Sequence, residues 1–176
     1  MVIPDKMVTD PPIPISNYCD GFGSRCSRIL APIGRLRLSA NGIVDDTGEP
    51  DAVVSEAHQN AEEDLPDEAL VFLLPSRYCE TDQLSDIAWS RFAKAPPGWG
   101  RDQAICDHVY QHFLRLGTRP RNPDDFSAWF EAYLGDAWYT FDARHNAPRI
   151  GRILIARGRC RWPACCLGST RLAQNN

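Results

Sequence analysis

The residues with reactive side chains in this sequence are mainly cysteines and histidines. Cys79 directly precedes a predicted helix, and a helix N-terminus lowers the pKa of a thiol toward the nucleophilic thiolate. His108 and His112 stand four positions apart on one predicted helix face, a spacing that binds metal ions when further ligands are near. No glutamate follows His108 and no third ligand is marked, so we interpret the pair as surface histidines.

A second group of thiols lies near the C-terminal end, at Cys160, Cys165 and Cys166. A structural zinc site needs four ligands, usually in spaced pairs, and two adjacent cysteines fit that geometry poorly. The sequence therefore predicts no metal and no other cofactor. The seven cysteines form an odd set without an export signal, which favours free thiols over a disulfide framework.

Composition excludes several classes of function. A net charge of −4 and a pI near 5.5 give no overall attraction to nucleic acid or anionic lipid. The longest apolar run, around Leu70 to Leu74, is far shorter than a membrane span. Met1 to Asp10 has no signal-peptide pattern, so we expect a cytoplasmic protein without nucleic-acid or membrane partners.

The N-terminal third is predicted to contain loops and short strands. Alternation at Leu36, Leu38 and Ala40 indicates a half-buried strand. Asn41-Gly42 follows it and precedes Ile43-Val44, a pattern that predicts a hairpin turn. Residues 45–68 are acidic and polar, and we interpret them as a long surface loop.

Two helices and one further strand are expected in the middle of the chain. Leu70 to Leu74 is interpreted as a buried strand or as the run-in to the next unit, and it ends at Pro75. Apolar residues at helical spacing predict helices over residues 82–92 and 101–116.

A hairpin over residues 126–143 is the clearest element. Two alternating stretches flank Gly135-Asp136, which suits a two-residue type II′ loop that pairs Leu134 with Ala137. In this register one face is apolar and belongs to the core. The other face brings positions 127 and 142 together. It also carries Trp129, Tyr133 and Trp138, whose exposure would suit a non-enzymatic module that binds a protein or peptide.

Taken in order, these segments resemble one family. The hairpin from Asp125 to His145 is similar to the last two catalytic strands of bacterial transglutaminase-like proteins, which read His-Ala-Trp/Tyr-x-Glu and Trp-x-x-Phe-Asp. Ser76 to Asp82 with the helix after it, and Asp10 to Ile15 with Asp20-Gly-Phe-Gly, resemble the same family. The resemblance covers residues 1–158 and implies a papain-like cysteine enzyme fold.

The resemblance implies a cysteine, histidine and aspartate triad for thiol acyl transfer or amide hydrolysis on a protein or peptide substrate. Asp142 fills the aspartate position, whereas Ser127 replaces the histidine and is no base near neutral pH. The family's Gly-x-Cys-Arg/Trp-Asp-Phe motif belongs between the second helix and the hairpin, but only Gly117 to Asp125 lie there. The sequence therefore predicts a transglutaminase-like pseudoenzyme without turnover.

A working enzyme with a rearranged site is the competing hypothesis. Its nucleophile would be Cys79, for which a structural role is nevertheless favoured, or Cys106. Cys106 falls mid-helix and is also interpreted as a structural thiol. His145 follows the second strand and could turn toward Asp142 to replace the missing base, although we favour a loop histidine without a catalytic role.

We therefore predict an α+β architecture in three parts. Residues 1–69 form a β-rich region with an acidic linker, 70–158 an incomplete transglutaminase-like domain with two helices and an antiparallel hairpin, and 159–176 an irregular tail. Loss of the nucleophile helix is expected to expose apolar strand faces and to promote self-association. The abrupt change of composition after Arg157 suggests a shifted reading frame as one hypothesis for the altered tail.

Overall fold

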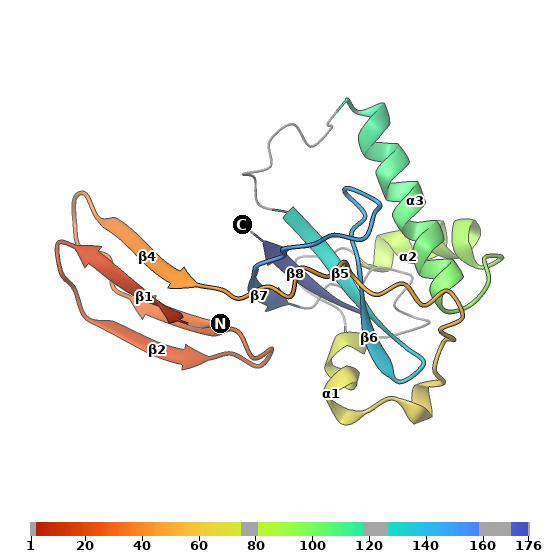
Figure 1. Ribbon diagram of the computed structural model, residues 1–176, viewed down its shortest axis with the longest axis horizontal. Coiled ribbons are helices and arrows are strands. Elements are labelled where there is room, and N and C mark those ends of the chain that lie inside the picture. The colour runs from red at the N-terminus through yellow and green to blue at the C-terminus, as the bar shows by residue number, and fades with distance from the viewer. Residues whose placement is uncertain (1–2, 75–80, 118–126, 159–169, 176) are drawn as a thin grey trace.

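The computed structural model describes residues 3–74, 81–117, 127–158 and 170–175 (Figure 1). An arm of four strands extends to one side of the molecule. In it β1 (Ile3–Asp10) pairs antiparallel with β4 (Arg37–Ile43), and β2 (Ile15–Cys19) pairs antiparallel with β3 (Arg25–Ile29). The prediction of short strands in this part of the chain is confirmed.

The hairpin predicted at Asn41-Gly42 is wrong. β4 runs through both residues, and Asn41 lies opposite Lys6 of β1. A Cβ at Gly42 would lie 3.1 Å from the backbone nitrogen of Asp5. Glycine is therefore needed here because two strands approach closely, and not because the chain turns.

The strand predicted at Leu70 to Leu74 is also wrong, because this part of the chain is helical. A 3₁₀ turn, η1 (Glu62–Asp64), precedes α1 (Asp67–Leu70), and η2 (Val71–Leu73) follows directly. Ala69 and Phe72 are buried three positions apart, which is a helical spacing, and acidic residues in the first turn of α1 suit a helix N-terminus. A short apolar run does not distinguish a strand from a buried helical turn.

The two longer helices are confirmed as α2 (Thr81–Phe92) and α3 (Trp99–Arg115). Ala88 and Phe92 of α2 pack against Ile105 of α3. The buried guanidinium of Arg101 donates hydrogen bonds to the carbonyls of Phe92, Ala93 and Ala95 at the end of α2. These bonds satisfy carbonyls that the last turn of a helix leaves without partners.

The body of the protein contains a four-stranded sheet with the order β6-β5-β8-β7. β5 (Ser127–Leu134) and β6 (Ala137–Phe141) form the predicted hairpin, and Leu134 pairs with Ala137 as expected. Gly135 and Asp136 both have positive φ angles, 50° and 66°, so the loop is of type I′ and the predicted type II′ is wrong. β7 (Leu154–Gly158) pairs with β8 (Thr170–Asn175).

Two expectations about exposure and the tail need correction. Thr170–Asn175 was predicted to be part of an irregular tail, but it forms β8 between β5 and β7. Loss of the nucleophile helix was expected to expose apolar strand faces, but α3 packs on the face of the hairpin that was predicted to belong to the core. The resulting core joins residues from α3, the hairpin and the segment after β4: Ala57, Trp99, Cys106, Ala132, Leu134 and Phe141.

The mixed α+β architecture predicted from the sequence is confirmed. The arm contacts the body through the turn between β2 and β3 (Figure 1). The ring of Phe22 lies 5.9 Å from that of Phe72. Ser24 Oγ accepts a hydrogen bond from the backbone nitrogen of Arg157 in β7 and donates one to its carbonyl. Within the described ranges, every helix is too short or too polar to span a lipid bilayer.

Candidate functional site

Asp142 lies directly after β6, and its carboxylate is almost completely buried, with 1% of the side chain exposed. Oδ1 accepts hydrogen bonds from the backbone nitrogens of Arg144 and His145, each at 3.0 Å. Asn146 closes the turn, because its nitrogen donates to the Asp142 carbonyl at 2.7 Å and its φ angle is 53°. The carboxylate thus builds the turn that carries His145.

The imidazole of His145 is held between a carboxylate and a guanidinium. Nδ1 lies 2.9 Å from Asp142 Oδ2, and Arg149 NH1 lies 3.0 Å from Nδ1 and 3.1 Å from Nε2. Because NH1 is about equally far from both ring nitrogens, it makes no single directed bond to Nε2 and lies close against the ring. A general base at this ring would therefore have to gain a proton beside the positive charge of Arg149.

A second carboxylate is tied to the same group of side chains. Asp51 comes from the segment between the arm and the body. Its Oδ2 accepts hydrogen bonds from the backbone nitrogen of Arg149, at 2.6 Å, and from the guanidinium of Arg152. Arg152 NH2 also lies 4.0 Å from Asp142 Oδ2. Arg152 therefore bridges the carboxylates of Asp51 and Asp142.

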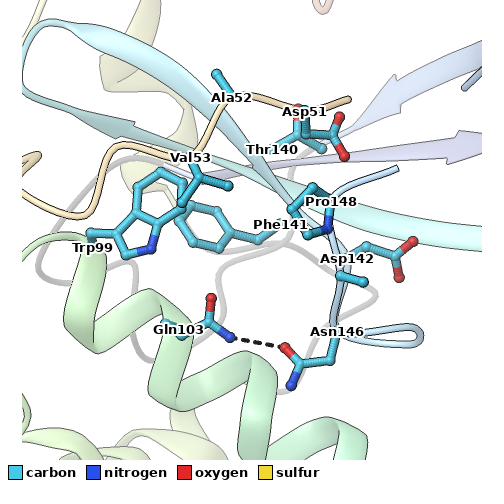
Figure 2. Close-up of a pocket in the computed structure, with 11 residues that line it drawn as sticks. Asp51, Ala52, Val53, Trp99, Gln103, Thr140, Phe141, Asp142, Asn146 and Pro148 are labelled. Carbon is cyan, nitrogen blue, oxygen red and sulfur yellow. Dashed lines mark hydrogen bonds between the residues drawn. The ribbon is translucent and has the colours of Figure 1, made fainter. Parts of the chain in front are cut away.

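Next to these charges lies a hollow of about 260 Å³ between α3, the end of β6 and the segment that contains Asp51. Figure 2 shows Val53, Trp99 and Phe141 along its apolar side and the hydrogen-bonded amides of Gln103 and Asn146 at its other end. The carboxylates of Asp51 and Asp142 turn away from the Trp99 ring (Figure 2). The hollow is thus apolar with polar groups at one end, a character typical of a binding pocket.

Cys106 lies in the middle of α3 and is 2% exposed. Burial raises the pKa of its thiol well above the usual range, and the nearby carboxylates of Asp102, Asp142 and Asp107 raise it further. The thiol stays neutral at physiological pH. This geometry agrees with a structural thiol and leaves Cys106 without the thiolate that acyl transfer requires.

The remaining predicted site residues are only partly described. Ser127 begins β5, opposite Asn175 of β8. The described β5–β6 ladder ends with Phe130 opposite Phe141, so the predicted meeting of positions 127 and 142 stays a prediction. Cys79 and the tail cysteines, Cys160, Cys165 and Cys166, lie outside the described residues.

One histidine of the pair on α3, His108, has a side-chain partner. The guanidinium of Arg91 lies 3.0 Å from His108 Nε2, and burial together with the positive charge of Arg91 lowers the pKa of His108. His112 is exposed. Among residues 3–74, 81–117, 127–158 and 170–175, no group of three potential ligands is arranged to hold a metal ion.

The aromatic face proposed for binding is not exposed as predicted. Trp129 is only 5% exposed, and the guanidinium of Arg152 lies over its ring at 5.0 Å from the centroid. Trp138 is half-buried and makes edge-on contacts with Tyr133 and with Phe72. Because residues from outside the hairpin cover this face, the sheet is packed on both sides.

The sequence analysis missed Asp51, Arg149 and Arg152, which complete the site. One signal could have indicated them. Residues 45–68 contain ten acidic and no basic residues, whereas residues 143–176 contain seven arginines and no acidic residue. Two segments of opposite charge are candidates for contact in the fold.

The described geometry is accompanied by one clear structural likeness. No protein-family model matches the sequence, and no curated protein is similar to it. A solved structure from Cytophaga hutchinsonii, described as a "putative cysteine protease", superposes with a TM-score of 0.60 and 20% sequence identity. The match covers 100% of this chain and 77% of the other. At this identity the likeness establishes the fold alone.

Proposed function

We propose that this chain is a transglutaminase-like protein of the cysteine-protease fold that does not turn over substrate and instead binds a peptide. The proposal joins the resemblance of the hairpin segment to transglutaminase-like proteins with the geometry around His145. In this proposal the residues around Asp142 and His145 no longer catalyse acyl transfer, and the hollow beside them binds the peptide.

The single observation that carries the proposal is the state of the imidazole. A general base must have a free acceptor nitrogen within hydrogen-bond reach of the nucleophile. Here the Arg149 guanidinium lies 3.0 and 3.1 Å from the two ring nitrogens of His145, and the thiol of Cys106 is buried and neutral. Neither half of a thiolate–imidazole pair is therefore ready for acyl transfer.

The hollow supports the binding half of the proposal. Its volume of about 260 Å³ suits one or two side chains more than a whole cofactor. Trp99 and Phe141 offer aromatic surface, and Gln103 and Asn146 offer amide groups that can orient a peptide. Val53, which is 57% exposed, forms the accessible part of the lining.

Turnover is tested by incubating the full chain with a glutamine peptide and a fluorescent amine, and separately with a peptide amide in water. We expect product at the level of the buffer blank. Product that disappears in His145→Ala would overturn the proposed loss of activity.

Binding is tested by fluorescence anisotropy with labelled peptides from a protein digest. Val53→Glu places a charge at the hollow and should abolish binding, whereas Val44→Glu, at an exposed valine outside it, should leave binding unchanged. Equal binding by both variants would refute a role for the hollow.

A working cysteine enzyme is the second candidate, and one observation favours it. The 2.9 Å contact between Asp142 and His145 is the pairing that orients a catalytic imidazole. In this alternative Cys79 supplies the thiolate. It predicts that iodoacetamide at neutral pH modifies Cys79 much faster than the exposed Cys19, and that Cys79→Ala abolishes turnover. Equal rates at the two cysteines would exclude it.

A further inference from the structure

The segment from Asp51 to Asn60, named the strap, crosses from the arm to the helices and forms one wall of the hollow (Figures 1 and 2). Its two ends are held by different kinds of interaction. This difference is the basis of the inference.

The C-terminal end of the strap is fixed by short-range hydrogen bonds, of which two join backbone groups. Trp99 donates its backbone hydrogen to the carbonyl of Ala57, and Gly135 donates to the carbonyl of His58. Asn60 donates a side-chain hydrogen bond to Asp136 at 2.7 Å. Ala57 and Asn60 are buried, so these contacts are protected from water and from salt.

The N-terminal end is held mainly by charge. The Asp51 nitrogen donates to the Arg149 carbonyl, but the other contacts bring the Asp51 carboxylate to the Arg149 nitrogen and to the guanidinium of Arg152. Between the two ends, Ala52 and Val53 are exposed on their outer sides. The strap can therefore leave the body at Asp51 without disturbing its other end.

Arg152 is largely buried, and some of its hydrogen-bond donors have no acceptor among the described residues. Only 11% of its side chain is exposed, and no described residue accepts a hydrogen bond from its Nε or NH1. Asp51 meets both Arg149 and Arg152 through the single oxygen Oδ2. A guanidinium prefers a carboxylate that uses both oxygens, and buried donors without acceptors are destabilising. The Arg152 guanidinium, which also lies 4.0 Å from Asp142 Oδ2, is therefore a carboxylate site whose donors Asp51 uses only in part.

We propose that the Arg149 nitrogen and the Arg152 guanidinium form a carboxylate-binding site, that Asp51 fills it as a displaceable latch, and that the carboxylate of an acidic peptide takes its place. When Asp51 leaves, the strap opens, the hollow becomes accessible, and an apolar side chain of the peptide enters it. This rests on the proposed peptide-binding function and names the chemistry of its ligand. The carboxylate belongs to an acidic side chain or to a peptide C-terminus.

The latch opposes ligand binding because it is part of the same chain. A tethered group competes at an effective concentration in the millimolar range, so an external peptide binds weakly until the latch is removed. Asp51→Asn removes the charge with little change of shape. Asp46→Asn is the matched control, because Asp46 is an exposed residue of the same acidic segment that contacts only the nearby Gly48.

The experiment measures binding of fluorescent decapeptides to the full-length chain by anisotropy. One peptide has the sequence of residues 47–56 with blocked ends and with glutamine in place of its two glutamates, so its one carboxylate corresponds to Asp51. A second has asparagine at that position, and a third is unrelated, with an apolar residue beside a free C-terminal carboxylate. We expect Asp51→Asn to bind a carboxylate peptide about tenfold or more tighter than the wild type and Asp46→Asn do. The asparagine peptide should not bind.

Adding Arg152→Gln to Asp51→Asn should abolish the gained affinity. If the first peptide binds more tightly than the third, the ligand carboxylate belongs to an acidic side chain. If the third binds more tightly, it belongs to a peptide C-terminus. Equal affinity of Asp51→Asn and the wild type, or equal binding of the asparagine peptide, would overturn the latch. Cleavage or transamidation of a bound peptide would instead refute the loss of turnover and leave the latch intact.

A second measurement uses the wild-type chain, so its result does not depend on whether the variants fold. Amide hydrogen exchange at Asp51 and Arg149 should accelerate several-fold between low and 1 M salt, while exchange at Trp99 and Gly135 stays constant. Parallel changes at all four amides would contradict an electrostatic latch with a fixed second end.

Discussion

The side chains of Asp142 and His145 are joined by a 2.9 Å contact within one turn of the chain. The same carboxylate accepts two backbone hydrogen bonds, so it is a structural element of the turn as well as a partner of the imidazole. In a triad the aspartate orients a histidine that lies elsewhere in the sequence. Here it orients a histidine three residues away, and the guanidinium of Arg149 lies close to both nitrogens of that ring.

Asp142→Asn should lower the free energy of unfolding by about 1–3 kcal/mol, because it removes a buried charge that Arg149 and Arg152 face at 3.7 and 4.0 Å. Urea denaturation measures this change. Asp45→Asn, at an exposed acid beyond the site, should stay within about 0.5 kcal/mol of the wild type. If the two variants are equally stable, the carboxylate is not the structural centre of the turn.

Cys106 should react slowly with iodoacetamide in the native protein between pH 6 and 8, because burial and the adjacent carboxylates keep its thiol neutral and shielded. Cys19 is exposed and serves as the internal reference. Mapping of alkylated peptides by mass spectrometry gives both rates. Fast modification of Cys106 without denaturant would show that the helix exposes a thiolate.

A pair of substitutions separates size from polarity at the same position. Cys106→Ser places a hydroxyl in an apolar core and should be less stable than Cys106→Ala by about 1 kcal/mol or more. Thermal unfolding of the two variants measures the difference. The opposite order would indicate that the thiol has a polar partner.

Asp102 should make stability fall as the pH rises. Burial raises the pKa of this carboxyl from 3.8 to about 7, against the smaller opposing effect of Arg101. Between these values the folded chain holds a proton that the unfolded chain has lost, so its stability decreases from pH 4 toward pH 7. The full shift corresponds to about 4 kcal/mol.

Asp102→Asn should therefore be more stable than the wild type at pH 8, and the gain should shrink toward pH 4. Urea denaturation across this range provides the comparison. Asp86→Asn, at an exposed carboxylate on α2, should show no such trend. A constant difference between Asp102→Asn and the wild type would contradict a proton on Asp102 in the folded state.

Gly98→Ala should destabilise the protein by roughly 3 kcal/mol or more, because its φ angle is 81° and the new Cβ would lie 2.4 Å from the Ala57 carbonyl. Gly117→Ala is the matched control, since its φ angle is 69° but no atom lies within 4 Å. The control should show only the backbone strain of about 1 kcal/mol. If both variants lose a similar free energy of unfolding, the backbone at Ala57 moves to make room for the new methyl group.

Much of the body could be predicted from local pattern. The helices α2 and α3 follow from apolar residues at helical spacing, and the β5–β6 hairpin with Leu134 opposite Ala137 follows from alternation around Gly135-Asp136. These signals are carried by neighbouring residues, and periodicity fixes which side chains share a face. The likeness to the solved structure from Cytophaga hutchinsonii supports the mixed α+β fold.

Other elements depended on partners that the sequence does not reveal. Asn41-Gly42 continues a strand because β1 lies beside it, and Trp129 is buried because Arg152 covers its ring. Leu70 to Leu74 became helical because Phe72 packs between Phe22 and Trp138, residues from distant parts of the chain. In each case the burial supplied by the distant partner outweighed a weak local preference.

The sequence by itself determined the residue types of the site, with Asp142 and His145 close in the chain, and the opposite charges of the segments around residues 51 and 149. Only the tertiary structure decided that Asp51 meets Arg149 and Arg152 across 98 and 101 residues and that the Arg149 guanidinium lies against the imidazole of His145. The physical reason is that ion pairs and burial depend on distance in space. Distance in space is set by the path of the whole chain, and short-range pattern carries no record of it.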